Sequence, residues 1–203
     1  MERAKRQAKR FFNTDGNFKI AEYMHFCSRM LKKEPKETLA APAMIVFCAF
    51  EQMQTVIEYG KRYGFMWNYP LVFIKNYSPS VLKANMKIVG ATEYAIVLYR
   101  DKLPKFRNLD SNGNGHMIFN WFKWERETNY PKIHPTQKPV ALIRELIEIF
   151  TDPSDVVIDP CAGSGSTLVA ARECGRSSYG FEVDKKFYNL AQEKMLSQIQ
   201  LML

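Results

Sequence analysis

Two short stretches in the last third of the chain carry residues whose types and spacing suit a ribose-bearing cofactor. Residues 156–167 read VVIDPCAGSGST. The strand-forming part ends in Asp159, and a loop that contains Gly163 and Gly165 follows it. Glycine permits backbone angles that other residues avoid, so such a loop can approach a ligand closely. A second strand-like run, SSYGFEVD at 177–184, then brings Glu182, whose carboxylate can accept both hydroxyls of a ribose.

The same residues indicate which cofactor fits. The loop lacks the third glycine of the GxGxxG pattern, and Asp159 disfavours the pyrophosphate of a dinucleotide. An acid at the end of this strand suits the positively charged amino-acid part of S-adenosylmethionine better. A tight turn between a strand and a helix also needs glycine for structural reasons, so the loop alone leaves a structural role open. Glu182 is the residue that favours the cofactor.

Apolar periodicity predicts the elements that position these residues. Helical spacing predicts helices over residues 18–32, 51–63, 140–150 and 167–174, and from 185 onward. Runs of β-forming residues predict strands over residues 43–50, 69–75, 93–99, 156–159 and 179–183. Residues 1–12 are interpreted as a basic helix start or a frayed arm, and residues 76–92 and 100–130 as irregular. The alternation predicts an α/β domain with a mainly parallel sheet.

Composition is that of an ordinary globular domain. The chain has 203 residues, of which 46% are hydrophobic and 25% charged, so it is long enough for one domain with a core. The apolar run at 40–50 contains a proline and is too short to span a bilayer, and residues 1–10 do not resemble a signal peptide. The four cysteines and three histidines are scattered, so we expect no metal site or disulfide framework and a cytoplasmic location.

The net charge of +8 is distributed unevenly. Residues 1–130 carry 21 basic and 12 acidic side chains, whereas residues 131–203 carry 8 and 9. A positive field outside the cofactor motifs suits a polyanionic partner, although a merely solvated basic surface would look the same.

A further motif, HPTQKP at 134–139, precedes the apolar helix that leads to DPCAGSGST. With these motifs the chain resembles the amino-methylating DNA methyltransferases of bacteria and phages, the N6-adenine/N4-cytosine group. Within that group it resembles the circularly permuted subgroup, whose cofactor motif lies near the C-terminus. The resemblance is close over residues 130–195 and general over 13–100. It implies a circularly permuted, Rossmann-like α/β sheet of the S-adenosylmethionine-dependent methyltransferases.

The resemblance also implies roles for individual residues. Thr136 and Lys138 would reach the carboxylate of S-adenosylmethionine, Glu182 the ribose, and Phe181 the adenine. The methionine and sulfonium side would be lined by Asp159, Ala162, Gly163, Gly165, Ser166 and Thr167. His134 is interpreted as a residue that pins the loop rather than as an acid or base.

By the same resemblance, residues 1–203 form a single methyltransferase domain. Residues 76–130 would contain a target-recognition insert, and residues 131–203 would form the cofactor-binding half. The insert and its surroundings are basic and aromatic, which suits double-stranded DNA and an unstacked base. The expected DNA contacts are Lys83, Lys87, Arg100, Lys102, Lys105, Arg107 and Lys123. The alternative is that the aromatic residues belong to the core and the basic ones are only solvated.

One family element is not found. The family holds the target base with a tetrad of an acid or amide, two prolines and an aromatic residue, and this sequence contains no Pro-Pro pair. We therefore assign no catalytic residue. In the permuted family the tetrad ends a central strand that precedes the helix predicted at 18–32. Without that strand we expect two unpaired sheet edges, which an N-terminal segment or a partner chain would complete.

The primary hypothesis is a DNA methyltransferase that acts on an exocyclic amine, with adenine N6 favoured over cytosine N4. The alternative is a catalytically inactive or split remnant that binds S-adenosylmethionine, DNA or both. A third hypothesis, methylation of RNA or protein, is disfavoured by HPTQKP. The sequence leaves open the recognition site, the oligomeric state, a homodimer included, and any restriction partner.

Overall fold

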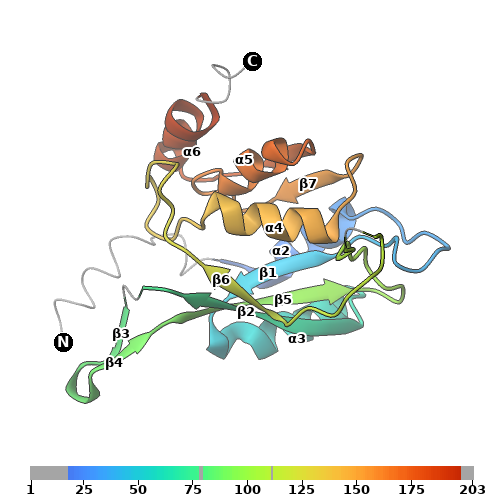
Figure 1. Cartoon of the computed structure of the whole chain (residues 1–203), viewed down its shortest axis with the longest axis horizontal. Helices are drawn as coiled ribbons and strands as arrows, with labels where there is room; N and C mark the ends of the chain where they lie inside the picture. The colour runs from blue at the N-terminus through green and yellow to red at the C-terminus, as the bar shows by residue number, and fades with distance from the viewer. Residues whose placement is uncertain (1–17, 78–79, 111, 198–203) are drawn as a thin grey trace.

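The computed structural model describes residues 18–77, 80–110 and 112–197 (Figure 1). The arm expected at residues 1–12 lies outside these ranges. The helices are α2 (Ile20–Met30), α3 (Met53–Arg62), α4 (Val140–Phe150), α5 (Ser166–Glu173) and α6 (Lys185–Ala191). The strands are β1 (Met44–Cys48), β2 (Trp67–Lys75), β3 (Ser80–Lys83), β4 (Ile88–Gly90), β5 (Thr92–Tyr99), β6 (Trp121–Trp124), β7 (Val156–Asp159) and β8 (Ser177–Gly180).

The larger sheet has the strand order β1-β5-β2-β6. Strand β5 runs antiparallel to both β1 and β2, and β6 runs parallel to β2. The expectation of a mainly parallel sheet was therefore wrong here. The chain leaves β2, forms the β3–β4 hairpin and returns as β5 beside β2, and such a short return reverses the strand direction. Strands β7 and β8 form a separate, parallel pair.

Helices cover both faces of the larger sheet (Figure 1). Alternate residues of a strand point to opposite faces, so Ala95 and Val97 of β5 join one core cluster, whereas Ile96 and Leu98 join another. The first cluster includes the apolar side of α4, which confirms the helical face predicted from its periodicity. The second cluster contains buried residues of α2 and α3.

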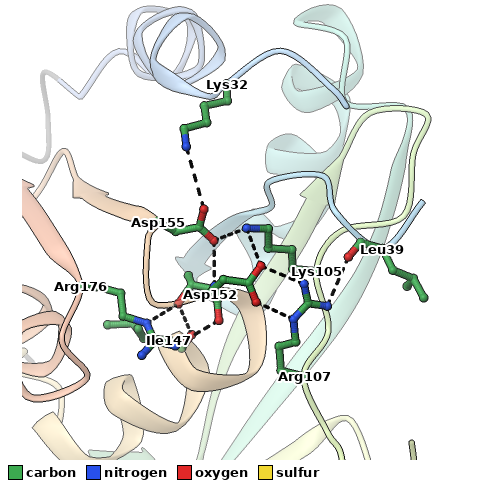
Figure 2. A network of polar contacts seen from close by, with 9 residues as sticks. Lys32, Leu39, Lys105, Arg107, Ile147, Asp152, Asp155 and Arg176 are labelled. Carbon is green, nitrogen blue, oxygen red and sulfur yellow. Dashed lines mark hydrogen bonds and ion pairs between the residues drawn. The ribbon is translucent and has the colours of Figure 1, made fainter. Parts of the chain in front are cut away.

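The two sheets do not share backbone hydrogen bonds in the part of the chain that the structure describes. There β1 pairs with β5 alone, and β7 pairs with β8 alone. The sheets are instead joined by side chains, both those of the first core cluster and a charged group that lies before β7 (Figure 2).

This group is a network of charged residues that we call the ionic junction: Lys32, Lys105, Arg107, Asp152 and Asp155. Lys105 Nζ lies 2.5 Å from Asp155 Oδ2 and 2.8 Å from Asp152 Oδ2, and Arg107 donates two hydrogen bonds to Asp152. Lys32 Nζ lies 4.0 Å from Asp155. The hydrogen bonds from Arg107 and Lys105 hold the pKa of Asp152 far below its usual range. The ionic junction thus joins the segment after β5 to the turn before β7.

Three differences from the sequence-based expectation concern short strands. The hairpin β3–β4 and the strand β6 lie in segments expected to be irregular. Strand β8 ends at Gly180, so Glu182 lies two residues beyond the strand that it was expected to end. Within the described ranges, no helix is long and apolar enough to cross a membrane.

Replacing Lys105 tests the ionic junction. The Lys105→Met variant removes two hydrogen-bonded ion pairs from a mostly buried ammonium, so the free energy of unfolding should fall by about 1–3 kcal/mol. Lys102→Met is the matched control, because the Lys102 side chain is exposed. Urea denaturation measures the free energy of unfolding of both variants and of the unaltered chain. Equal losses for the two variants would contradict a structural role for the ionic junction.

Candidate cofactor site and nucleic-acid surface

The loop between β7 and α5 depends on two glycines with positive φ. Gly163 has φ 53° and Gly165 has φ 80°, backbone angles that residues with a Cβ rarely adopt. The Gly165 N–H donates to Ala162 O at 2.7 Å, and Gly165 is the N-cap of α5. Below the turn, the hydroxyls of Ser164 and Ser166 are buried and 2.9 Å apart. The loop is therefore a tight turn held by its own backbone.

Glu182 lies directly against this turn. Its Oε2 accepts a hydrogen bond from Gly163 N at 2.8 Å, and its Oε1 accepts one from Asp184 N at 2.7 Å. The pairing of β7 with β8 continues past the strands, because Phe181 N donates to Asp159 O and Ala162 N donates to Phe181 O, both at 2.9 Å. The two strand ends therefore bring the carboxylates of Asp159 and Glu182 to one edge of the small sheet.

The loop at 131–139 packs on the same turn. The His134 ring lies 3.7–3.8 Å from the position that a Cβ on Gly163 would occupy, and its centroid is 4.2 Å from that of Phe187. Thr136 contacts His134 Nδ1 through its backbone N at 3.3 Å and through Oγ1 at 3.1 Å. Burial lowers the pKa of His134, which favours the neutral ring. These contacts suit a residue that pins the loop.

Lys138 links the small sheet to the large one. Its Nζ lies 4.6 Å from the centre of the Phe47 ring, at the end of β1. Burial lowers the pKa of Lys138, and the nearby carboxylates of Asp159 and Glu93 oppose that shift. A half-buried ammonium at this position is well placed to receive a further carboxylate.

Helix α2 adds a contact that the sequence did not suggest. The Phe26 ring lies edge-on to Phe181, with centroids 5.4 Å apart, while Phe181 remains 49% exposed. Met24 and Cys27 of α2 thus lie in the second core cluster, and Phe26 touches the residue after β8. The expected cofactor residues of the glycine loop, the 131–139 loop and the segment after β8 therefore gather at one edge.

Comparison with known proteins identifies the family. The family model for DNA methylases of the N6/N4 group matches residues 4–193. The chain belongs to this family. It is 31% identical over 169 residues to YubD of Escherichia coli (strain K12), a methylase by name, with 83% of this chain and 66% of YubD covered. It is 26% identical over 143 residues to the DNA adenine methyltransferase YhdJ of the same strain, with 68% of this chain and 48% of YhdJ covered.

The fold agrees with this assignment. The crystal structure of the M1.HpyAVI–SAM complex matches with a TM-score of 0.72 at 24% identity, covering 88% of this chain and 83% of that one. The mixed α/β methyltransferase fold is thereby shown. The matched segments span less than two thirds of YubD and YhdJ.

Basic residues of this DNA methylase family member fall into two groups. Arg100 donates to the carbonyls of Ser28 and Lys32 at the end of α2, and Lys105 and Arg107 belong to the ionic junction. These three side chains have structural partners within the domain, so they are poor candidates for DNA contacts. The side chain of Lys83 lies outside the described part of the structure.

The remaining expected DNA contacts are accessible. Lys87 and Lys102 are exposed, and Lys123 is exposed although it pairs with Glu125 at 2.6 Å. Lys87 lies in the β3–β4 hairpin, which extends away from the rest of the domain (Figure 1). Lys123 lies on strand β6.

Gly180 offers a test of the close packing beneath the glycine loop. A Cβ at this position would lie 2.6 Å from Leu168 Cδ1 and 3.0 Å from Ala162 Cβ. Leu168 can move, but Ala162 Cβ moves only with the loop backbone. Gly180→Ala should therefore lower the free energy of unfolding by about 1–3 kcal/mol.

Gly115→Ala is the matched control, because nothing lies within 4 Å of the Cβ that it would add. Thermal and urea unfolding of both variants measure the effect. If Gly180→Ala were as stable as Gly115→Ala, the packing of β8 against the loop would be looser than the structure shows.

Proposed function

We propose that this chain binds S-adenosylmethionine at the edge formed by the glycine loop and the 131–139 loop. The observation that carries the proposal is the arrangement of charges there. The half-buried Lys138 and two carboxylates, on Asp159 and Glu182, lie beside a turn of small residues. S-adenosylmethionine has a carboxylate, a positively charged amino-acid end and a ribose, so its groups match the charges and acceptors of this edge. When bound, it supplies an activated methyl group.

Each residue has a role in this proposal. Lys138 and Thr136 hold the carboxylate, and Glu182 accepts hydrogen bonds from the ribose. Phe181 lies beside the adenine, with the ring of Phe26 behind it. The methionine and sulfonium side is lined by Asp159, Ala162, Gly163, Gly165, Ser166 and Thr167.

The proposed reaction is methylation of an exocyclic amine in double-stranded DNA, with adenine N6 favoured. Family membership supports a base amine as acceptor, and YhdJ, an adenine methyltransferase by name, supports adenine. The proposed target-recognition insert spans residues 76–130, and its exposed Lys87, Lys102 and Lys123 supply phosphate contacts. Catalysis of this kind depends on positioning and electrostatics.

This sequence contains no Pro-Pro pair, so none of its residues is assigned to hold the target base. We propose that a strand ending in the tetrad pairs with the free edges of β1 and β7, which the described structure leaves without strand partners. A longer form of this polypeptide or a partner chain could provide that strand. The missing tetrad also supports a second candidate function, that of a remnant or split subunit that binds S-adenosylmethionine without transferring its methyl group.

Lys138→Met tests cofactor binding directly. Losing a charge-assisted hydrogen bond to the carboxylate should weaken the affinity for S-adenosylmethionine by about 10- to 100-fold. Lys132→Met removes the same charge from an exposed position in the same loop and should leave the affinity unchanged. Isothermal titration calorimetry on the 203-residue chain measures the affinity of both variants for S-adenosylmethionine. No binding to the unaltered chain, or equal effects of the two changes, would refute the proposed site.

A transfer assay separates the enzyme from the remnant. The chain is incubated with double-stranded DNA and S-adenosylmethionine, alone and with the polypeptide encoded directly upstream of it, and the nucleosides are analysed by mass spectrometry. The enzyme hypothesis predicts N6-methyladenine when the upstream polypeptide supplies a tetrad. Binding of S-adenosylmethionine with no methylated base in either mixture would favour the remnant. N4-methylcytosine would correct the choice of base.

A further inference from the structure

The 131–139 loop has no regular backbone hydrogen-bond ladder, so its polar groups need other partners. The side chain of Gln137 supplies three of them. Its Oε1 accepts hydrogen bonds from Ile133 N at 2.9 Å and from His134 N at 3.4 Å, and its Nε2 donates to Pro131 O at 3.0 Å. The backbone N–H of Gln137 also donates to His134 O at 3.2 Å. The loop is therefore closed around one amide side chain.

This closure fixes the residues on either side of Gln137. His134, whose backbone N–H donates one of these hydrogen bonds, packs over Gly163 and holds Thr136 through its Nδ1. Lys138 follows Gln137 directly in the chain and places its ammonium over Phe47. The contacts of the Gln137 side chain itself are with the loop, so it acts on the glycine turn through His134.

Both the oxygen and the nitrogen of the Gln137 amide are needed to make the three hydrogen bonds. A carboxylate can accept hydrogen bonds from Ile133 and His134, but it cannot donate to Pro131 O and would face that carbonyl with a negative charge. A methionine side chain of similar length makes none of the three hydrogen bonds. A change of one functional group at position 137 therefore weakens the closure, by one hydrogen bond in glutamate and by all three in methionine.

We propose that Gln137 is a positioning residue that preorganises Thr136 and Lys138 for the carboxylate of the cofactor. This inference rests on the proposed binding of S-adenosylmethionine. A loop already held in its binding shape loses less conformational entropy when the ligand arrives, so the affinity is higher. This gain in affinity is confined to ligands that carry the amino-acid part of S-adenosylmethionine, because Thr136 and Lys138 contact only that part in the proposal.

The test compares two ligands on the full chain. S-adenosylhomocysteine has the carboxylate, whereas 5′-methylthioadenosine has the same nucleoside without the amino-acid part. For Gln137→Glu, calorimetry should show about a tenfold or greater loss of affinity for S-adenosylhomocysteine, equivalent to about one hydrogen bond, and an unchanged affinity for 5′-methylthioadenosine. Gln54→Glu, on helix α3, adds the same charge far from the loop and should change neither affinity.

Gln137→Met is the second variant, and it should show the same selective loss without added charge. If Gln137→Glu fails to fold, the methionine variant carries the test. Unchanged binding of S-adenosylhomocysteine, or an equal loss for both ligands, would overturn the positioning role. Failure of the unaltered chain to bind either ligand would instead refute the proposed function on which the inference rests.

Discussion

The structure depends on how two sheets are held together without a shared strand pair. Strands β1 and β7 do not pair with each other in the described residues, so the first core cluster and charged side chains hold the two sheets together. The ionic junction joins the sheets near the N-terminal end of β7, where Asp152 and Asp155 bind Lys105 and Arg107. Lys138 joins the opposite side, between Phe47 and Asp159.

The proposed cofactor site lies mainly on the small sheet, and its link to the large sheet runs through Lys138. The strand proposed above would lie between β1 and β7. In this proposal, binding of S-adenosylmethionine and holding of the target base are therefore done by separate sets of residues. The proposal assigns the first to residues of this sequence and assigns the second to none of them.

Much of the glycine loop and of helix α4 could be predicted from sequence, because the sequence patterns that indicate them are local. The run that ends in Asp159, the two glycines and the apolar face of α4 each depend on residues a few positions apart, and the structure has the predicted strand, turn and helix. The acid Glu182 was expected at a strand end and lies two residues beyond it, because β8 stops at Gly180 where the chain packs against Leu168.

Other features depend on distant partners and could not be predicted in this way. Arg100, Lys105 and Arg107 were assigned to DNA by their charge, but their hydrogen bonds go to carbonyl and carboxylate groups 45 to 72 residues away in the sequence. The role of Gln137 depends on the path of the loop around it. Strand β6 could have been found from Phe122 and Trp124, which alternate with exposed residues and are both buried.

The most direct test of this account is a crystal structure of the chain with S-adenosylhomocysteine. The account predicts the ligand carboxylate within hydrogen-bonding distance of Lys138 Nζ and Thr136 Oγ1, and the ribose hydroxyls on Glu182. A ligand bound elsewhere, or a carboxylate directed away from Lys138, would contradict it.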